Sequence, residues 1–244
     1  MLEERGIRRS VCRTCAIRDT SLCRALPDPL LDQMPRLTRR RRVRAGGQVL
    51  ADDLGTPLVA HVVSGVVRLA KSLPDGRTQI VALRFASDLV GDLFTTAPSA
   101  VMAEAATEVE LCCVPRARFE SLLASGDKLP ALVADHMARQ LEEAREWMLL
   151  LGRKSAIERV ASLMLYLAER SGTRVPCSQI SPEKTIELPL SRTEMADFLG
   201  LTLETVVRML KKLEHSGAIA LTPPRSMRVL DPASLRRQAL QDDG

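Results

Sequence analysis

The pattern of apolar and polar positions changes from one region of the 244-residue chain to the next. From residue 43 to about residue 116, short β-like runs of apolar residues alternate with turn signals rich in Gly, Asp and Pro. The runs that predict strands are Val49–Leu50, Leu58–Val63, Val66–Ala70, Gln79–Phe85, Ala103–Ala106 and Val109–Val114. Many short strands at regular spacing are typical of a sandwich or barrel, and here they predict a jelly roll.

Helical periodicity flanks this β-rich region on both sides. A short helix is predicted over Asp28–Leu37, a long one over Leu129–Gly152 and another over Lys154–Glu169, while Ser171–Pro189 is predicted to be a loop. Five apolar residues of the long helix follow a spacing of 4, 3, 4 and 3, namely Met137, Leu141, Ala144, Met148 and Leu151. That spacing is an a/d heptad seam. The helix could pack on its own domain, but the spacing and the length favour a dimer interface.

The segment Leu190–Gly217 carries the clearest motif in the chain. Ser191 and Glu194 form a capping box that starts one helix, and Gly200 allows the left-handed turn that two steeply angled helices need. Thr202 caps the second helix. The buried face of this second helix has helical spacing and consists of Val206, Leu210 and Leu213. The segment is therefore predicted to be a helix-turn-helix.

The opposite face of the second helix has the chemistry of a DNA reader. Arg208 can donate two hydrogen bonds to guanine, and Glu204, one turn earlier, can accept one from cytosine. The alternative is a surface ion pair between the two, worth only ~0.3–0.5 kcal/mol. Downstream, Ala218–Thr222 and Met227–Leu230 predict a β-wing whose Arg225 and Arg228 meet DNA phosphates. The residues expected at the DNA are Glu204, Thr205, Val207, Arg208, Lys211 and Arg225.

Composition and charge agree with this interpretation without proving it. The formal net charge is +5, which is compatible with a DNA partner. The basic run Arg39–Arg42 could contact nucleic acid, but a solvated strand edge is favoured. Neither a signal peptide nor an apolar run of about 18 residues is found, so a cytoplasmic protein is expected. His61, His136 and His215 are scattered, and no phosphate loop or nucleophile–base pair is found, so the protein is not expected to be an enzyme.

Six cysteines in a reducing compartment are better interpreted as thiols or metal ligands than as disulfides. Cys12, Cys15 and Cys23 form a C-x2-C-x7-C pattern, and Cys112 and Cys113 lie at the end of the last β-like run. Four thiolates suit an iron–sulfur cluster or a structural zinc ion, although zinc usually prefers paired C-x2-C knuckles; free thiols are the third possibility. Cys177 is expected to be a bystander. Five surrounding arginines, which should depress the thiol pKa values, are Arg8, Arg9, Arg13, Arg18 and Arg24.

These features together resemble the Crp/Fnr superfamily of transcription regulators and, within it, the oxygen-responsive FNR-type members. The resemblance covers nearly the whole chain, and the segments that carry it are the cysteine group, Phe85–Asp92, Cys112 before Val114-Pro115, Met148–Lys154 and Leu199–Arg208. It implies a [4Fe–4S] cluster on Cys12, Cys15, Cys23 and Cys112. Cys113 is the runner-up, because strand alternation sends it to the opposite face. The cluster form would be the dimeric DNA-binding form, and oxygen would degrade the cluster and release the dimer.

The resemblance also implies an α+β fold with three main parts. These are a cyclic-nucleotide-binding-like β-roll (jelly roll), a long dimerisation helix and a C-terminal winged helix-turn-helix. The expected domains are a cysteine-rich segment at 1–26, the β-roll at 27–127, the dimerisation helix at 128–152 and the DNA-binding domain at 153–244.

The family pattern fixes further expectations about partners. The Arg-Ser pair that would hold a cyclic phosphate is missing, with Ala97–Ala100 in its place, so no cyclic nucleotide is expected. The family reads a palindrome of TTGAT-type half-sites with the pattern E-x-x-S-R, in which Val207 here replaces Ser. RNA polymerase is a further expected partner. The alternative is a regulator of the same fold that senses haem-bound gas or another small ligand.

Overall fold

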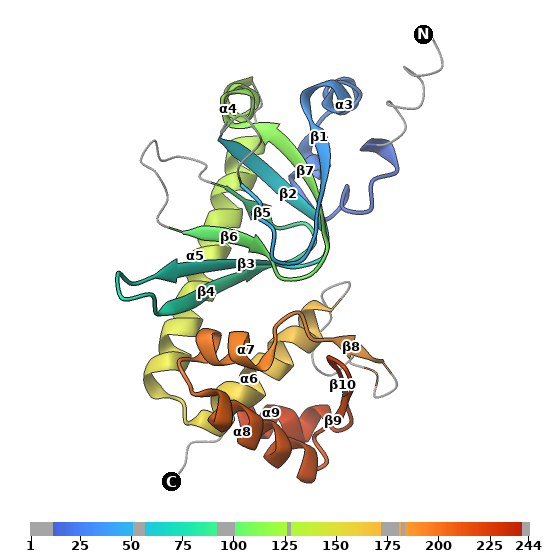
Figure 1. The fold of residues 1–244 in the computed structure, drawn as a ribbon. Helices are drawn as coiled ribbons and strands as arrows, with labels where there is room; N and C mark the ends of the chain where they lie inside the picture. Colours follow the sequence, from blue (N-terminus) through green and yellow to red (C-terminus); the bar gives the residue numbers. More distant parts are fainter. Residues whose placement is uncertain are drawn as a thin grey trace. The chain divides into compact units, whose positions relative to one another are not determined.

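The computed structural model describes residues 12–50, 57–91, 101–125, 128–171, 181 and 184–240 (Figure 1). The chain divides into two compact units, one within residues 1–71 and 81–142 and the other within residues 72–80 and 143–244.

A four-stranded antiparallel sheet forms the frame of the first unit, in the order β1-β7-β2-β5. Its strands are β1 (Arg39–Val43), β7 (Val109–Pro115), β2 (Leu58–Ser64) and β5 (Leu89–Val90). A three-stranded sheet has the order β4-β3-β6, with β4 (Thr78–Arg84), β3 (Val67–Ser72) and β6 (Met102–Ala105). Side chains from both sheets share one apolar cluster, which includes Val62, Val67, Ala103, Val109 and Leu111. The predicted β-roll is thus confirmed.

Short helices close one end of the roll. These are the 3-10 helix η1 (Leu22–Ala25), α2 (Asp28–Leu31), α3 (Met34–Leu37) and α4 (Arg116–Ser125). Figure 1 shows α3 and α4 at the same end of the strands β1 and β7. Their apolar residues pack with those of β2, β5 and β7 in a second cluster that includes Met34, Val59, Val114, Phe119 and Val133.

Two local predictions for this unit are wrong. Asp28–Leu37 is two four-residue helices rather than one, because Pro35 has no backbone N–H to continue the helical hydrogen bonding. Val49–Leu50 is not a strand but a bend after an isolated bridge at Gln48. Val49 is nevertheless fully buried in the roll, and its N–H donates to the Ala103 carbonyl of β6 at 2.9 Å.

Other predictions for this unit are confirmed in whole or in part. The arginine run Arg39–Arg42 lies in β1, at the edge of the four-stranded sheet, as expected, but only Arg39 and Arg42 are exposed; Arg40 and Arg41 are partly buried, so the expectation of a solvated edge is wrong for these two. The remaining five predicted strands correspond to β2, β3, β4, β6 and β7. The two-residue strand β5 was not predicted, since it is too short to show a period.

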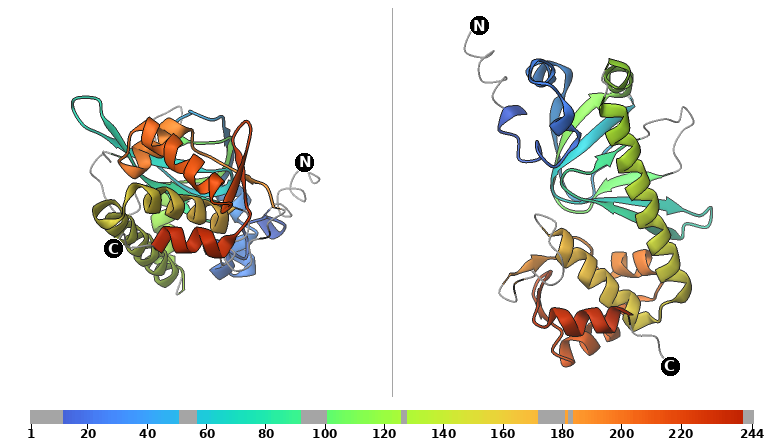
Figure 2. Two further views of the ribbon diagram at one scale, coloured as in Figure 1. Left: turned by 90° about the horizontal axis from the view of Figure 1, so that it is seen from below. Right: turned by 180° about the vertical axis from the view of Figure 1, so that it is seen from behind.

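One long helix, α5 (Leu129–Arg153), follows α4 and matches the predicted helix. Figure 2 (right) shows it as a continuous helix along its whole length. The next helix, α6 (Ala156–Arg170), starts at a capping box between Ser155 and Glu158. Within the residues that the structure describes, no helix is long and apolar enough to cross a membrane.

The C-terminal unit has the predicted winged helix-turn-helix. Helices α7 (Arg192–Leu199) and α8 (Leu203–His215) are followed by β9 (Ile219–Thr222), β10 (Ser226–Val229) and α9 (Pro232–Leu240). β10 pairs with β9 and also with β8 (Ile186–Glu187), which gives the order β8-β10-β9. β8 lies inside the segment Ser171–Pro189 that was predicted to be a loop, so that prediction is wrong for Ile186–Glu187. The helix α9 was not predicted from the sequence.

Candidate metal centre and nucleic-acid interface

Four cysteines come together at the edge of the β-roll. Cys12 and Cys15 belong to the N-terminal segment, Cys23 lies in η1, and Cys112 lies in β7. Burial, together with the neighbouring thiols of Cys112, Cys23 and Cys15, raises the pKa of Cys12 to about 11. Burial likewise raises the pKa values of Cys23 and Cys112, with Cys15 adding to both. These mutual effects, and the cavity that both Cys23 and Cys112 line, place the four thiols in one region of the β-roll.

Cys113 lies on the other face of β7. Its side chain is 4% exposed and packs in the β-roll core with Val43, Val62 and Leu111. Successive side chains of a strand point to opposite faces, so the adjacent residues Cys112 and Cys113 face the cysteine site and the core, respectively. The structure therefore brings Cys112, and not Cys113, to Cys12, Cys15 and Cys23. Cys177 lies outside the described residues.

The prediction that nearby arginines depress the thiol pKa values is wrong. Arg13 donates two hydrogen bonds of 2.9 Å to Asp32, and Arg18 lies 4.0 Å from Asp28, so both guanidiniums are paired with carboxylates. Arg24 is not among the main influences on the pKa of Cys12, Cys23 or Cys112, and Arg8 and Arg9 lie outside the described residues. Burial and mutual repulsion therefore dominate.

The cation at the site is Arg40, from the arginine run on β1. Its Nη2 donates to the Cys15 Sγ at 2.9 Å, and its Nη1 donates to the Glu110 Oε1 at 3.1 Å. It counteracts the rise in the pKa of Cys12, Cys23 and Cys112, although burial outweighs it at each. The sequence did signal the charge of this run but not which of its four members faces the cysteines.

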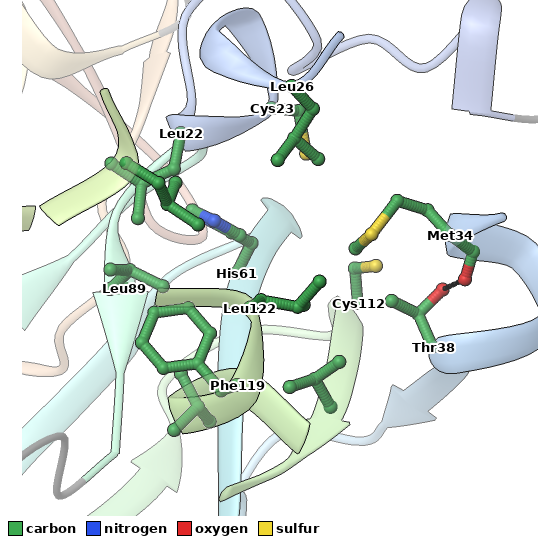
Figure 3. Close-up of a pocket in the computed structure, with 13 residues that line it drawn as sticks. Leu22, Cys23, Leu26, Met34, Thr38, His61, Leu89, Cys112, Phe119 and Leu122 are labelled. Atoms are coloured by element: carbon green, nitrogen blue, oxygen red, sulfur yellow. Dashed lines mark hydrogen bonds between the residues drawn. The ribbon is translucent and has the colours of Figure 1, made fainter. Parts of the chain in front are cut away.

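A small apolar cavity adjoins the thiols (Figure 3). It has a volume of about 40 Å³ and is lined by Cys23, Cys112, Met34, His61 and apolar side chains such as Phe119. Burial lowers the pKa of His61 to about 4, so the ring is neutral, and its Nδ1 has no hydrogen-bond partner among the described residues. The cavity is far below the ~300–1,000 Å³ of a typical ligand pocket.

Hydrogen bonds connect the cysteine segment to α5. The hydroxyls of Thr20 and Ser87 are 2.5 Å apart, and Ser87 has a positive φ of 77°. Two residues further, the Leu89 N–H donates to His136 Nε2 on α5 at 3.3 Å. His136 directly precedes Met137, the first residue of the predicted seam. Ser87 and His136 were not predicted, because only the tertiary structure places them between the two elements.

The seam of α5 is open to solvent in the single chain. Met137, Leu141 and Met148 are 37%, 52% and 63% exposed, and Ala144 is exposed as well. Leu151 is partly buried. An apolar stripe of this kind on a 25-residue helix is typical of an interface.

The helix-turn-helix is built by local capping. The Ser191 side chain accepts from the Glu194 N–H, and Gly200 ends α7 in the left-handed conformation with φ of 61°. The Thr202 side chain then accepts from the Thr205 N–H at the start of α8. Val206, Leu210 and Leu213 are buried, as predicted.

The other face of α8 is solvent-accessible and charged. Glu204, Val207, Arg208 and Lys211 are all exposed, while Thr205 is partly buried. The Glu204 N–H and the Thr202 hydroxyl bond the Glu204 carboxylate and lower its pKa. Among the described residues no ion pair joins Glu204 to Arg208, so that alternative is not observed and both groups are available to a partner.

The wing arginines differ from each other. Arg225 Nη2 donates to the Pro189 carbonyl at 3.2 Å and lies 3.4 Å from Glu194 Oε2, so it attaches the wing to the start of α7. Arg228, on β10, is exposed.

Comparison with known proteins agrees with this architecture. Residues 41–125 match the family described as "Cyclic nucleotide-binding domain", and residues 158–238 match "Crp-like helix-turn-helix domain". A "Probable transcriptional activator" of Rhizobium leguminosarum bv. viciae is 38% identical and covers 93% of this chain and 92% of that protein. The "Transcriptional activator protein FnrL" of Cereibacter sphaeroides is 36% identical, with 95% and 92% covered. The solved structure of FixK2 from Bradyrhizobium japonicum has a TM-score of 0.72 at 30% identity, with 84% and 98% covered.

Proposed function

The chain belongs to the Crp/Fnr family of transcription regulators, and we propose that it is a redox-responsive member whose DNA binding depends on a [4Fe–4S] cluster. Regulators of this family bind DNA and typically act as dimers, and the relatives are transcription regulators rather than enzymes. The observation that carries the proposal is the convergence of Cys12, Cys15, Cys23 and Cys112 from two distant segments.

The four thiols have the chemistry that a cluster needs. Metal binding requires thiolates, and burial, with the neighbouring thiols adding to it, raises the pKa values of Cys12, Cys23 and Cys112 and so opposes their ionisation. A positive metal core among them would favour the thiolate forms. When bound, the cluster would supply an electron-accepting centre sensitive to oxygen. Among the described residues, no three Cys, His, Asp or Glu side chains are arranged to hold a single metal ion. A single zinc site is thus less well supported than the larger cluster, which holds its ligands farther apart.

The connection between Thr20, Ser87, Leu89 and His136 supports a route from the cysteines to α5. Thr20 lies between Cys15 and Cys23, so a change in how those thiols are held would alter the position of its hydroxyl. Ser87 is held in an unfavourable backbone region, which is typical of a switch segment. In the proposed function, this connection sets the position of α5 and hence its ability to pair.

Pairing would use the exposed seam of α5, with Met137, Leu141, Ala144, Met148 and Leu151 against the same residues of a second copy. Twofold pairing would place two α8 helices on half-sites about one helical turn apart. The proposed operator is therefore a palindrome.

Base contacts would come from α8. Arg208 would donate to a guanine and Glu204 would accept from a cytosine, as in a TTGAT-like half-site. Val207 would pack on a thymine methyl, while Thr205 and Lys211 would contact the backbone. RNA polymerase is the further proposed partner. No cyclic nucleotide is proposed, although residues 97–100, where its phosphate would bind, lie outside the described residues.

The alternative, a haem-based or small-ligand sensor, receives less support. The cavity beside Cys23 and Cys112 has about 40 Å³, too little for a haem in this conformation. The separating experiment is anaerobic purification followed by iron and sulfide analysis and an absorption spectrum. About four irons and four sulfides per chain with a broad band are expected for the cluster. A sharp Soret band, or zinc without sulfide, would reject it.

A further inference from the structure

We propose that Arg40 is a positioning residue of the cysteine site, with Glu110 fixing its guanidinium so that it donates to the sulfur of Cys15. The inference rests on the proposed function, and it goes further by assigning a role to a residue outside the four ligands. Its role is to hold Cys15 and to place one positive charge beside the proposed cluster, which is anionic together with its four thiolate ligands.

The geometry uses both arms of the guanidinium. One nitrogen is 2.9 Å from the Cys15 sulfur, and the other is 3.1 Å from the Glu110 carboxylate. Arg40 is directly opposite Cys112 in the β1–β7 register, so it stands next to a second proposed ligand. The side chain thus joins the N-terminal cysteine segment to β7, the strand that carries Glu110 and Cys112.

Strand alternation singles Arg40 out from the other arginines of the run. Arg39 and Arg41 lie on the face of Cys113 and act on that thiol instead. Arg42 shares the face of Arg40 but is exposed, and among the described residues it has no side-chain hydrogen bond or ion pair. Arg42 is therefore a matched control, with the same charge on the same strand.

Hydrogen bonds to ligand sulfurs and nearby positive charge stabilise a cluster against loss of electrons. Removal of Arg40 should therefore make the cluster easier to oxidise and shorten its life in air. Because partners of metal ligands typically contribute ~10–100-fold to metal affinity, a change of at least about tenfold is expected. Glu110→Gln should produce a smaller change, since it loosens Arg40 without removing its charge.

The test compares wild type with Arg40→Gln, Arg40→Lys, Glu110→Gln and Arg42→Gln. Iron, sulfide and the decay of cluster absorbance after mixing with air are measured for each, together with the melting temperature of the cluster-free chain. Arg40→Gln should lose the cluster at least about tenfold faster than wild type. Arg40→Lys should lose it at an intermediate rate, and Arg42→Gln should lose it at the wild-type rate. Equal decay rates for Arg40→Gln and Arg42→Gln, with unchanged melting temperatures, would overturn the proposal.

A second measurement does not depend on the cluster. In the cluster-free chain, iodoacetamide labelling followed by peptide mass spectrometry gives the reaction rate of each cysteine. Arg40→Gln should slow Cys15 several-fold and leave Cys113 unchanged, whereas equal rates in both proteins would contradict the contact. If the wild type holds no iron, the proposed function fails, and this labelling comparison still decides whether Arg40 acts on Cys15.

Discussion

The cysteine site and the DNA-reading helix α8 are assembled from very different distances along the chain. The site needs the N-terminal segment, the edge strand β1 and β7 to meet, whereas α8 is specified by residues 202–215 alone. The thiols are partly buried and mutually repulsive. Arg208 and Glu204, by contrast, are exposed and not paired with each other. The proposed cluster would be held inside the first region, whereas the second region presents its side chains outward, where the proposed DNA contacts would form.

The difference explains what each region can sense or read. In the proposed function, the cysteine site responds to loss of the cluster, because its thiols are then left without the positive core that favours their ionised forms. The structure of α8 would be the same with or without a cluster, since the cap at Thr202 and the buried residues Val206, Leu210 and Leu213 all lie in the C-terminal unit. In the proposed function, regulation therefore acts on the position of α8 in the dimer and not on its structure.

The largest expected effect concerns the two adjacent thiols of β7. Cys112→Ser should abolish cluster binding, as should Cys12→Ser, Cys15→Ser and Cys23→Ser, because each removes one of four ligands. Cys113→Ser should keep the iron, since that thiol lies in the core, although it will cost some stability. Iron analysis after anaerobic purification gives the answer, with Cys177→Ser as the control. Retention of iron in Cys112→Ser and its loss in Cys113→Ser would reverse the assignment.

The sequence predicted the local region better than the assembled one. Capping residues, Gly200 and the spacing of Val206, Leu210 and Leu213 define the helix-turn-helix within one short stretch. The choice between Cys112 and Cys113 depends on strand alternation, which the pattern supports only once β7 is accepted as a strand. Arg40 could not be selected from its run, because its contacts depend on the register of β1 with β7 and on the path of the N-terminal segment. The splitting of Asp28–Leu37, by contrast, could have been expected from Pro35.

The next largest effect tests whether α5 forms the dimer interface through which the cysteine site would act on the DNA-reading helix. Met148→Glu should yield monomers, because an unpaired charge buried in a seam costs several kcal/mol. Met102→Glu is the matched control, since Met102 is an exposed methionine on β6 outside the seam. Sedimentation velocity of the cluster-loaded proteins measures the difference. A dimer of unchanged mass for Met148→Glu would show that α5 does not form the interface.

A smaller effect distinguishes base reading from phosphate contact in the C-terminal unit. Arg208→Ala should weaken binding by ~1–3 kcal/mol per half-site and flatten discrimination at the G·C pair. Arg228→Ala should weaken all sequences alike and lower the salt slope by about 0.9 per half-site. Arg225→Ala should lower that slope less, because Arg225 is already bonded to Pro189 and Glu194. Competition with base-substituted operators decides this, and uniform weakening by Arg208→Ala would contradict the proposed register of α8.

The smallest effect tests the claim that α8 is locally specified. Thr202→Ala removes the side chain that accepts from the Thr205 N–H, and it should lower the free energy of unfolding by ~1 kcal/mol. Thr193→Ala, at an exposed position inside α7, is the control and should cost much less. Urea unfolding of both variants measures the difference. Equal stability of the two would mean that tertiary packing, and not the cap, fixes the start of α8.

In the proposed function, the cysteine site controls the DNA-binding region. The direct test is to purify the protein without oxygen and to measure binding to a TTGAT-type palindrome and iron content before and after exposure to air. We expect tight binding by the iron-loaded dimer, and a loss of binding that follows the loss of iron with the same time course. Binding that stays unchanged after the iron has gone would contradict the proposed dependence on a cluster.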